Sequence, residues 1–244
     1  WLQKGVLLPI VIGTISLTLF SIRQFKMEQP MINLRVFKFS MFTLGVIMVF
    51  AAMMLILASA ILLPLYLKGS LLLTAFTAGL VLLPGGLVNG LMSPFAGTLF
   101  DKYGPKFLVI PGFIMTTITT FFLSDITTTT STTIIIILHT CLFIGIALIM
   151  MPAQTNGLNQ LPPAFYPDGS AVMNTLSQIA GAIGTAVAVS IMAAGQENYN
   201  SNLKGMPNVE TMAEALTAGI QNAFLFALIA SIIGLVVSLF VKRV

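Results

Sequence analysis

Charged residues are scarce in this chain. Its 244 residues contain 11 Lys and Arg and 7 Asp and Glu, so charged side chains make up only 7% of the sequence. Hydrophobic residues make up 57%, and the mean hydropathy is +1.01. A water-soluble domain of this size cannot hide so much apolar surface inside one core. The shortage of charge therefore excludes a soluble globular protein and predicts an integral membrane protein.

Residues and motifs that carry enzyme chemistry are equally sparse. Cys141 is the single cysteine, which excludes an intrachain disulfide, and His139 is the single histidine, so no cluster has metal-ligand spacing. There is no Gly-x-Ser-x-Gly elbow and no Gly-rich loop before Lys-Ser/Thr that could hold a nucleotide. We expect no metal, no cofactor and no enzyme. An intramembrane hydrolase with a Ser–His pair assembled across helices is a disfavoured alternative.

Long apolar runs, in contrast, fill the chain. A helix needs about 20 apolar residues, each rising about 1.5 Å, to cross a bilayer. Seven runs are long enough, near 5–22, 40–67, 75–100, 107–124, 132–152, 170–194 and 218–241. Such runs with internal Gly and Pro suit helices rather than barrel strands, which alternate over about ten residues. The predicted fold is an all-α integral membrane protein with seven transmembrane helices, one extra helix followed by a bundle of six.

The segment 97–106, GTLFDKYGPK, separates two of these runs with polar residues at a predicted membrane surface. Gly104 and Pro105 predict a tight turn that ends one helix and starts the next. Gly97 predicts the close approach of a neighbouring helix. The connection is therefore expected to be short and stiff.

Asp101 lies where this segment leaves the hydrocarbon. Its carboxylate can accept hydrogen bonds from an adjacent helix N-terminus or from the amines of Lys102 and Lys106. We expect this cluster to latch one conformation, as a gate. The alternative is a polar turn whose lysines only fix topology.

The spacing of these residues resembles the signature of the major facilitator superfamily, Gly-x-Leu-x-Asp-basic-x-Gly-x-basic. The matching positions are Gly97, Leu99, Asp101, Lys102, Gly104 and Lys106. In that family the signature lies in the cytoplasmic loop between the second and third helices of a six-helix bundle. The resemblance implies a transporter bundle of two inverted three-helix repeats, here 40–124 and 132–241.

Lysines and arginines predict the orientation. With the 97–106 turn in the cytoplasm, eight of the 11 basic residues lie on that side, namely Arg23, Lys26, Arg35, Lys38, Lys102, Lys106, Lys242 and Arg243, whereas Lys4, Lys68 and Lys204 lie outside. This distribution fits the positive-inside rule, places the C-terminus in the cytoplasm and implies no nucleic-acid partner. The chain then divides into an extra transmembrane helix (1–22), a cytoplasmic linker (23–39) with an interfacial stretch Met31–Phe37, and a six-helix bundle (40–244).

The chain begins with Trp1 rather than Met, which predicts the C-terminal part of a longer protein. Two marks of the N-terminal bundle of drug-efflux members are absent: the span 132–152 has no arginine, and Gly181-Ala-Ile-Gly184 lacks a following proline. One extra helix before a bundle of six then resembles the end of the fourteen-helix drug:proton antiporters. Further stretches resemble that subfamily, namely 63–67 (LPLYL), 151–159 (MPAQTNGLN) and 181–185 (GAIGT).

This resemblance implies a multidrug exporter of the plasma membrane whose missing N-terminal six-helix bundle is the partner. Rocking of the two bundles would open a midplane site alternately to each side, and proton entry would drive a small amphipathic cargo out without a cofactor. Export of a lipid or metabolite, and an assembly role without transport, are the alternatives.

Polar side chains inside the spans are candidates for contact with cargo. Asn89 either lines the pathway or bonds between helices. Asn174 and Gln178 share one face of their span, which either faces the central cavity or packs on another helix. His139 can relay protons near physiological pH, although a packing role is the alternative.

Glycines on the span 75–100 recur at helical spacing. Gly86, Gly90 and Gly97 predict a smooth seam for helix packing. Pro84 and Pro94 on the same span can kink it.

Overall fold

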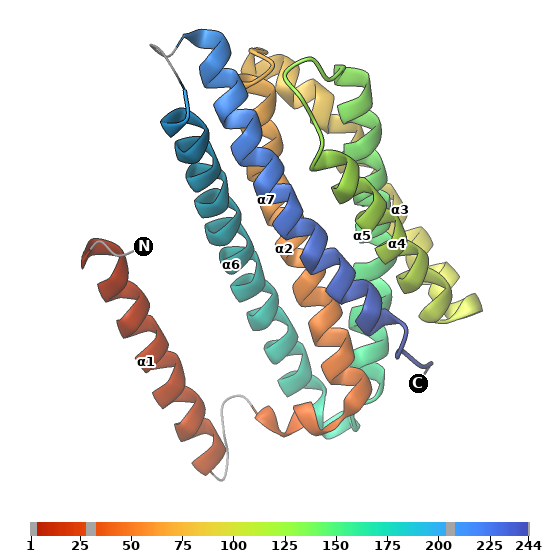
Figure 1. The fold of residues 1–244 in the computed structure, drawn as a ribbon. Coiled ribbons are helices and arrows are strands. Elements are labelled where there is room, and N and C mark those ends of the chain that lie inside the picture. Colours follow the sequence, from red (N-terminus) through yellow and green to blue (C-terminus); the bar gives the residue numbers. More distant parts are fainter. Residues whose placement is uncertain (1–3, 28–32, 204–207, 244) are drawn as a thin grey trace.

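The chain is all-helical in the part that the computed structural model describes, residues 4–27, 33–203 and 208–243 (Figure 1). The helices are α1 (Lys4–Lys26), α2 (Ser40–Gly69), α3 (Ala75–Tyr103), α4 (Lys106–Leu123), α5 (Thr132–Asn159), α6 (Tyr166–Ser201) and α7 (Val209–Ser238), with 3₁₀ turns η1 (Leu34–Lys38) and η2 (Pro163–Phe165). The predicted all-α class is confirmed.

Within the described residues, the six helices α2 to α7 are long and apolar enough to cross a membrane. They coincide with the last six predicted spans, but α5, α6 and α7 extend well beyond them into polar sequence. Hydrogen bonds and caps, rather than hydrophobicity, decide where a helix ends. In the capping box of α7, the Thr211 N–H donates to Asn208 Oδ1 at 2.7 Å, and the Asn208 N–H donates to Thr211 Oγ1 at 2.9 Å. The first predicted span, 5–22, lies in α1, and its crossing of the membrane stays a prediction.

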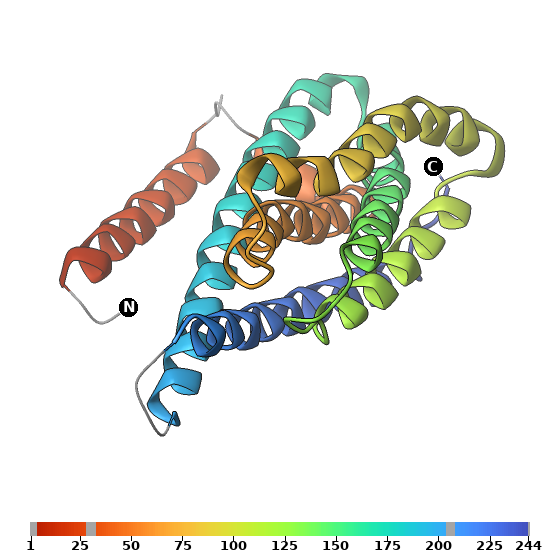
Figure 2. The ribbon, with the colours of Figure 1, turned by 90° about the horizontal axis from the view of Figure 1, so that it is seen from above.

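Helices α2 to α7 run alternately up and down in one bundle, and α1 lies apart from it (Figures 1 and 2). α2 lies at the centre of the bundle, where it packs against α5, α6 and α7. α5 packs in turn against α3 and α4, and α4 packs against α7. This arrangement encloses α2 more completely than any other candidate span among the described residues.

The packing repeats between the triplets α2–α4 and α5–α7. In this comparison α2 corresponds to α5, α3 to α6 and α4 to α7. The α2–α6 interface then corresponds to α5–α3, and the α2–α7 interface corresponds to α5–α4. All four of these interfaces are extensive. Because each triplet has three helices, the second triplet starts at the opposite end of the bundle. The two repeats are therefore inverted, as the resemblance implies.

α3 departs from this symmetry. α6 packs along α7, whereas its counterpart α3 makes only small interfaces with α4 and α2 and is held mainly by α5. Only 17% of the most apolar stretch of α3 is buried within the described chain, against 33% for α6 and its preceding turn. α3 is thus the span with the most surface left for lipid or for another polypeptide.

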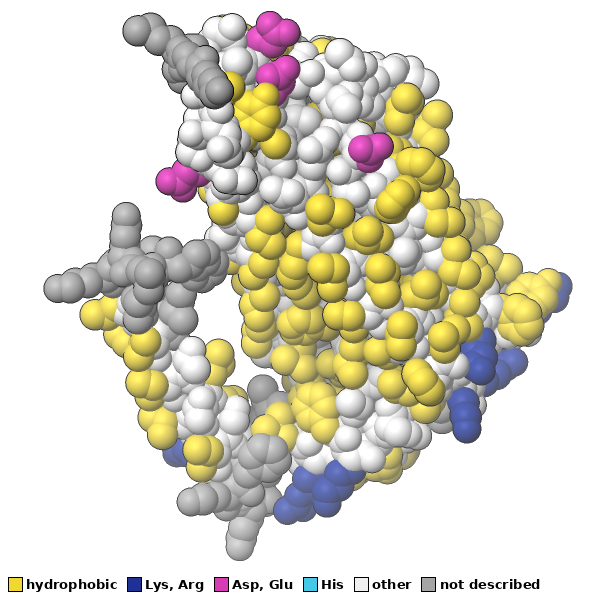
Figure 3. Space-filling view, in the orientation of Figure 1, with side chains coloured by type: hydrophobic (Ala, Val, Ile, Leu, Met, Phe, Trp, Pro, Cys, Tyr) yellow, Lys and Arg dark blue, Asp and Glu magenta, His cyan; other side chains and the backbone are white. Residues whose placement is uncertain are grey.

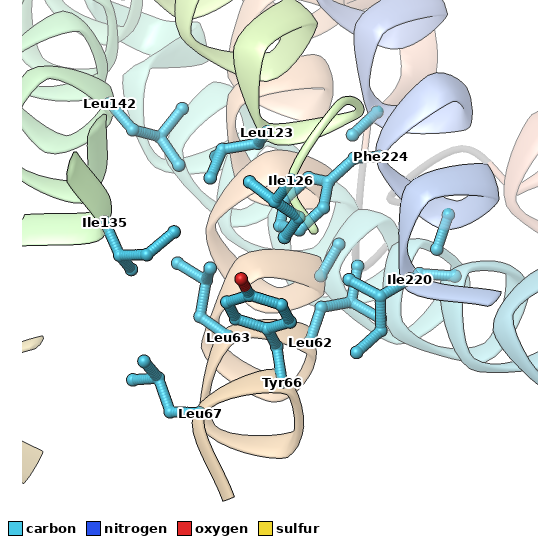
Figure 4. Packing of buried hydrophobic residues seen from close by; sticks show 14 of the residues in the cluster. Leu62, Leu63, Tyr66, Leu67, Leu123, Ile126, Ile135, Leu142, Ile220 and Phe224 are labelled. Atoms are coloured by element: carbon cyan, nitrogen blue, oxygen red, sulfur yellow. The ribbon is translucent and has the colours of Figure 1, made fainter. Parts of the chain in front are cut away.

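Two large apolar clusters form most of the core among the described residues, one toward each end of the bundle, and a third, small cluster lies at the basic end. The cluster in Figure 4 joins α2, α5 and α7 to the end of α4 and includes Leu62, Leu63, Tyr66, Leu67, Leu123, Ile126, Ile135, Leu142, Ile220 and Phe224. The hydroxyl of the fully buried Tyr66 donates to the Thr127 carbonyl at 2.6 Å. Gln221 Nε2 donates to the Ile126 carbonyl at 2.8 Å. These two hydrogen bonds hold the loop 124–131 over one end of the bundle.

Pairs of glycines set how closely the helices cross. The pairs are Gly45 with Gly157 (α2–α5), Gly112 with Gly145 (α4–α5) and Gly195 with Gly219 (α6–α7). A Cβ on Gly112 would lie 2.8 Å from the carbonyl oxygen of Gly145, and a Cβ on Gly145 would lie equally close to the carbonyl oxygen of Gly112. A side chain at either position therefore has to push the helices apart.

The two ends of the bundle differ in charge (Figure 3). The end where α2 begins, the basic end, carries Arg35, Lys38, Lys102, Lys106, Lys242 and Arg243 beside Asp101 and Asp168; the acidic end carries Asp125, Glu197, Glu210 and Glu214 beside Lys68. Lys204, which the sequence places with the second group, lies outside the described residues. This charge difference agrees with the predicted topology, in which most of the basic residues lie on the cytoplasmic side.

The segment before α2 is tied to the basic end. Val36 in η1 is fully buried, and the Asn33 N–H donates to Asp168 Oδ1 in the first turn of α6 at 3.3 Å. Of the predicted interfacial stretch Met31–Phe37, residues 31 and 32 lie outside the described part. The rest of that stretch anchors the predicted linker to the base of the bundle.

We expect Gly112→Ala to lower the free energy of unfolding by about 1–3 kcal/mol, because its methyl group forces α4 away from α5. Gly86→Ala is the matched control, since a Cβ there has nothing within 4 Å among the described residues. Thermal denaturation in detergent measures both variants. Equal losses of Tm in the two variants would contradict the role of Gly112 in the close crossing of α4 and α5.

Candidate functional site

The predicted gate motif forms the end of α3, a tight turn and the start of α4 at the basic end. Gly104 has φ +80°, a conformation that favours glycine, and its N–H donates to the Phe100 carbonyl at 2.8 Å to close α3. Pro105 is the N-cap of α4. The structure therefore has the short turn that Gly104 and Pro105 predict.

The glycine seam of α3 is mostly not a packing surface within this chain. Gly97 does meet α5, because a Cβ there would lie 3.0 Å from Cε of Met151. Gly86 and Gly90 have no atom within 4 Å of a Cβ position among the described residues. These two glycines pack on no helix of the described chain, so the seam stays a prediction there; their face is left open, and Leu99 near the end of α3 is also exposed.

The Asp101 side chain does not form the predicted cluster with its neighbouring lysines. It is exposed, and within the described part of the chain its carboxylate has no hydrogen bond or ion pair. Lys102 Nζ instead lies 5.1 Å from the centroid of the Tyr103 ring, and Lys106 is exposed. Adjacent residues on a helix do not face each other, which separates Asp101 from Lys102.

Arg243, which the sequence marked only for topology, occupies the turn instead. Its Nη2 donates to the backbone carbonyl of Asp101 at 2.9 Å. Its side chain runs along Gly104, where a Cβ would lie 3.2 Å from Cδ of Arg243. The gate motif thus contacts Arg243 through the backbone of Asp101, although the two residues are 142 positions apart in sequence.

Two amides at the end of α5, Asn156 within the helix and its C-cap Gln160, were not anticipated from the sequence and hold neighbouring segments at the basic end. Asn156 is 1% exposed, and its Nδ2 donates to the Lys242 carbonyl at 3.0 Å. Gln160 Oε1 accepts from the Met41 and Phe42 N–H groups at 2.5 and 3.2 Å, which caps the start of α2. The stretch 151–159 carried a family resemblance, but its partners are too distant in sequence for any spacing rule to find.

Asn174 and Gln178 are exposed on α6. The stripe that they share with Gly181 by spacing is divided, because Gly181 is buried against Leu57 of α2. Neither amide side chain has a hydrogen bond among the described residues. Because an amide is costly in lipid, their exposure indicates a face that meets water or another polypeptide.

Asn89 is half-buried on the face of α3 that packs on α5. It shares that face with Gly85 and Ala96, both buried, at a helical spacing of i, i+4 and i+11. Its side chain forms no hydrogen bond with the described residues, so the interhelical bond is not formed there. α3 and α6 lie on either side of the α2–α5 pair, so Asn89 does not cluster with Asn174 and Gln178 within this chain.

His139 packs against α3. It is 5% exposed, its ring centroid lies 4.6 Å from that of Phe143, and a Cβ on Gly85 would overlap its Nδ1. Among the described residues, His139 Nδ1 and Thr140 Oγ1 are buried without a hydrogen-bond partner. The fit of the imidazole into the notch at Gly85 accounts for its burial, and a role in proton relay stays a prediction.

Comparison with known proteins shows which family this chain resembles. The family model of the Major Facilitator Superfamily matches residues 8–185. Lincomycin resistance protein LmrB of Bacillus subtilis (strain 168) is 64% identical over 244 residues, which is 100% of this chain and 51% of that protein. Riboflavin transporter RibZ of Clostridioides difficile (strain 630) is 28% identical over 236 residues, 96% of this chain and 50% of that protein. Multidrug export protein EmrB of Escherichia coli (strain K12) is 25% identical over 220 residues, 88% of this chain and 43% of that protein. The chain spans about half the length of these relatives.

Gly85→Ala should destabilise the protein, because the added methyl group overlaps the imidazole of His139. His139→Ala removes that overlap, so the double variant should lose less stability than the sum of the single variants, by about 1–2 kcal/mol. A double-mutant cycle of unfolding free energies measures the difference. Additive losses would show that the imidazole does not occupy the notch.

Proposed function

Because this chain belongs to the major facilitator superfamily, we propose that it forms the C-terminal half of a secondary active exporter of amphipathic drugs that works by alternating access. The observation that carries the proposal is its 64% identity, along the whole chain, to half of a lincomycin resistance protein. The likeness to a multidrug export protein supports the same cargo class. The chain is part of a multi-pass membrane protein. The basic end would face the cytoplasm of a bacterial plasma membrane.

The proposed partner is an N-terminal six-helix bundle of the same protein, since the relatives are about twice as long. The weakly buried α3 and the exposed amides Asn174 and Gln178 on α6 suit a surface against that bundle. Cargo would bind between the halves, where Asn89 and these amides offer hydrogen bonds without charge. Rocking of the bundles would open the site to each side in turn.

The proposed drive is the proton motive force, with no cofactor. One charge moving inward supplies about 2.3 kcal/mol per 100 mV, which can offset uphill efflux. The described carboxylates of α3, α6 and α7 lie near helix ends, namely Asp101, Asp168, Glu197, Glu210 and Glu214. We therefore place the coupling carboxylates in the N-terminal half, and His139 at most assists them. Transport rather than catalysis is the proposed activity.

Export of a metabolite is the second candidate, which the likeness to a riboflavin transporter favours. Uptake of radiolabelled lincomycin and of riboflavin into inverted vesicles that contain the full-length protein separates the two candidates. Uptake of riboflavin alone would favour the metabolite.

Asp101→Asn in the full-length protein should reduce drug efflux at least about tenfold without lowering its amount in the membrane, because in the proposed gate this carboxylate, which is unpaired within the described chain, contacts the N-terminal half. Efflux of a fluorescent drug from energised cells measures the effect. Asp125→Asn is the matched control, since this exposed carboxylate lies at the acidic end. Wild-type efflux by Asp101→Asn would remove the gate from the proposal.

This chain by itself, reconstituted in liposomes, should not transport, since one wall of the cargo site is missing. A proton gradient should give no dye movement above that of empty liposomes, while the full-length protein under the same conditions should give transport. Proton-linked dye efflux by the isolated chain would overturn the division into halves.

A further inference from the structure

Residues 239–243, which follow α7, cross the basic end of the bundle; we name them the strap. α7 ends at Ser238, and the chain continues toward the turn between α3 and α4 (Figures 1 and 2). Val241 of the strap is fully buried, in the same apolar cluster as Val36 and Phe42. The strap is therefore packed into the base of the bundle.

The backbone of Lys242 is the inner anchor of the strap. Its carbonyl accepts from Asn156 Nδ2 of α5 at 3.0 Å, and its N–H donates to Met41 Sδ of α2 at 3.3 Å. The Lys242 side chain itself is exposed. A buried amide is costly unless it is bonded, so Asn156 favours a fixed position of the strap.

The outer anchor is Arg243. The carbonyl of Asp101 belongs to the last turn of α3, whose carbonyls have no partner within the helix. Arg243 donates to this carbonyl at 2.9 Å and places a positive charge at the negative end of the α3 dipole. Arg243 thus caps α3 from a distant part of the chain.

This cap acts at the end of α3, the candidate span that is least buried within the described chain. At the basic end, α3 contributes Ala96 and Phe100 to a small cluster with Leu108 of α4, against which Leu148 of α5 packs. The α3–α4 interface is small. The strap is accordingly a second tie between the α3–α4 turn and the pair α2–α5.

We propose that Arg243 is a positioning residue of the gate motif. Through the strap it holds the 97–106 turn against the base formed by α2 and α5, and the Arg243–Asp101 contact opens when this end of α3 moves. The inference rests on the proposed transport function for its purpose, but the contact itself can be tested without transport.

The test measures how fast a buried position beside the turn becomes accessible. Leu108, 3% exposed, is changed to cysteine in a background of the full-length protein from which every native cysteine, Cys141 included, has been removed, and a membrane-impermeant maleimide is added to inverted vesicles. Arg243→Ala should raise the labelling rate about three- to tenfold, because the cluster opens more often. Phe100→Cys, at a position that is 6% exposed on α3, is a second reporter should Leu108→Cys disturb folding.

Lys242→Ala is the matched control, because it also removes one positive charge from the strap but keeps both backbone contacts of residue 242, with Asn156 and Met41. It should label at the wild-type rate, and Arg243→Lys, which keeps a cation at the cap, should label more slowly than Arg243→Ala. Equal labelling of Arg243→Ala and Lys242→Ala, or no change in either, would overturn the proposal. Because labelling needs no efflux, these results stand whether or not the protein exports drugs.

Discussion

Close approach of helix backbones at glycine is the constraint on which this bundle depends. Lipid is as apolar as the helix surfaces, so no hydrophobic force draws the helices together, and packing at small residues decides where they cross. The glycine pairs join α2 to α5, α4 to α5 and α6 to α7. A hydroxyl contact adds to the α4–α7 interface, where Thr117 Oγ1 and Ser231 Oγ lie 2.6 Å apart. These crossings form a firm frame around α2.

α3 stands outside that frame, and this gives the gate motif its setting. Its glycines meet side chains, His139 and Met151, or nothing within the described chain, rather than a second glycine. A side chain can change rotamer where a backbone cannot yield, so contacts of this kind permit more movement. The family signature thus lies at the end of the least enclosed span, where a turn fixed by Gly104 meets Arg243.

Local sequence accounts for some features of the candidate site and not for others. Gly104 and Pro105 predicted their turn, because backbone freedom at glycine and the fixed φ of proline act within a few residues. The expected bonds between Asp101 and its neighbouring lysines failed, since nearness in sequence does not bring side chains to one side of a helix. Gly181 likewise shares a stripe with Asn174 by spacing, yet only Gly181 is buried.

The sequence by itself determined that the protein lies in a membrane, that it is helical, where its last six spans lie and to which family it belongs. These properties follow from composition, run length and the spacing of residues within one segment. Only the tertiary structure decided which glycines pack, where His139 fits and what holds the gate motif. Arg243 and Asp101 are 142 residues apart, and Asn156 and Lys242 are 86 apart. Such pairs depend on where helices cross and on how far they are rotated, which no periodicity within a single helix specifies.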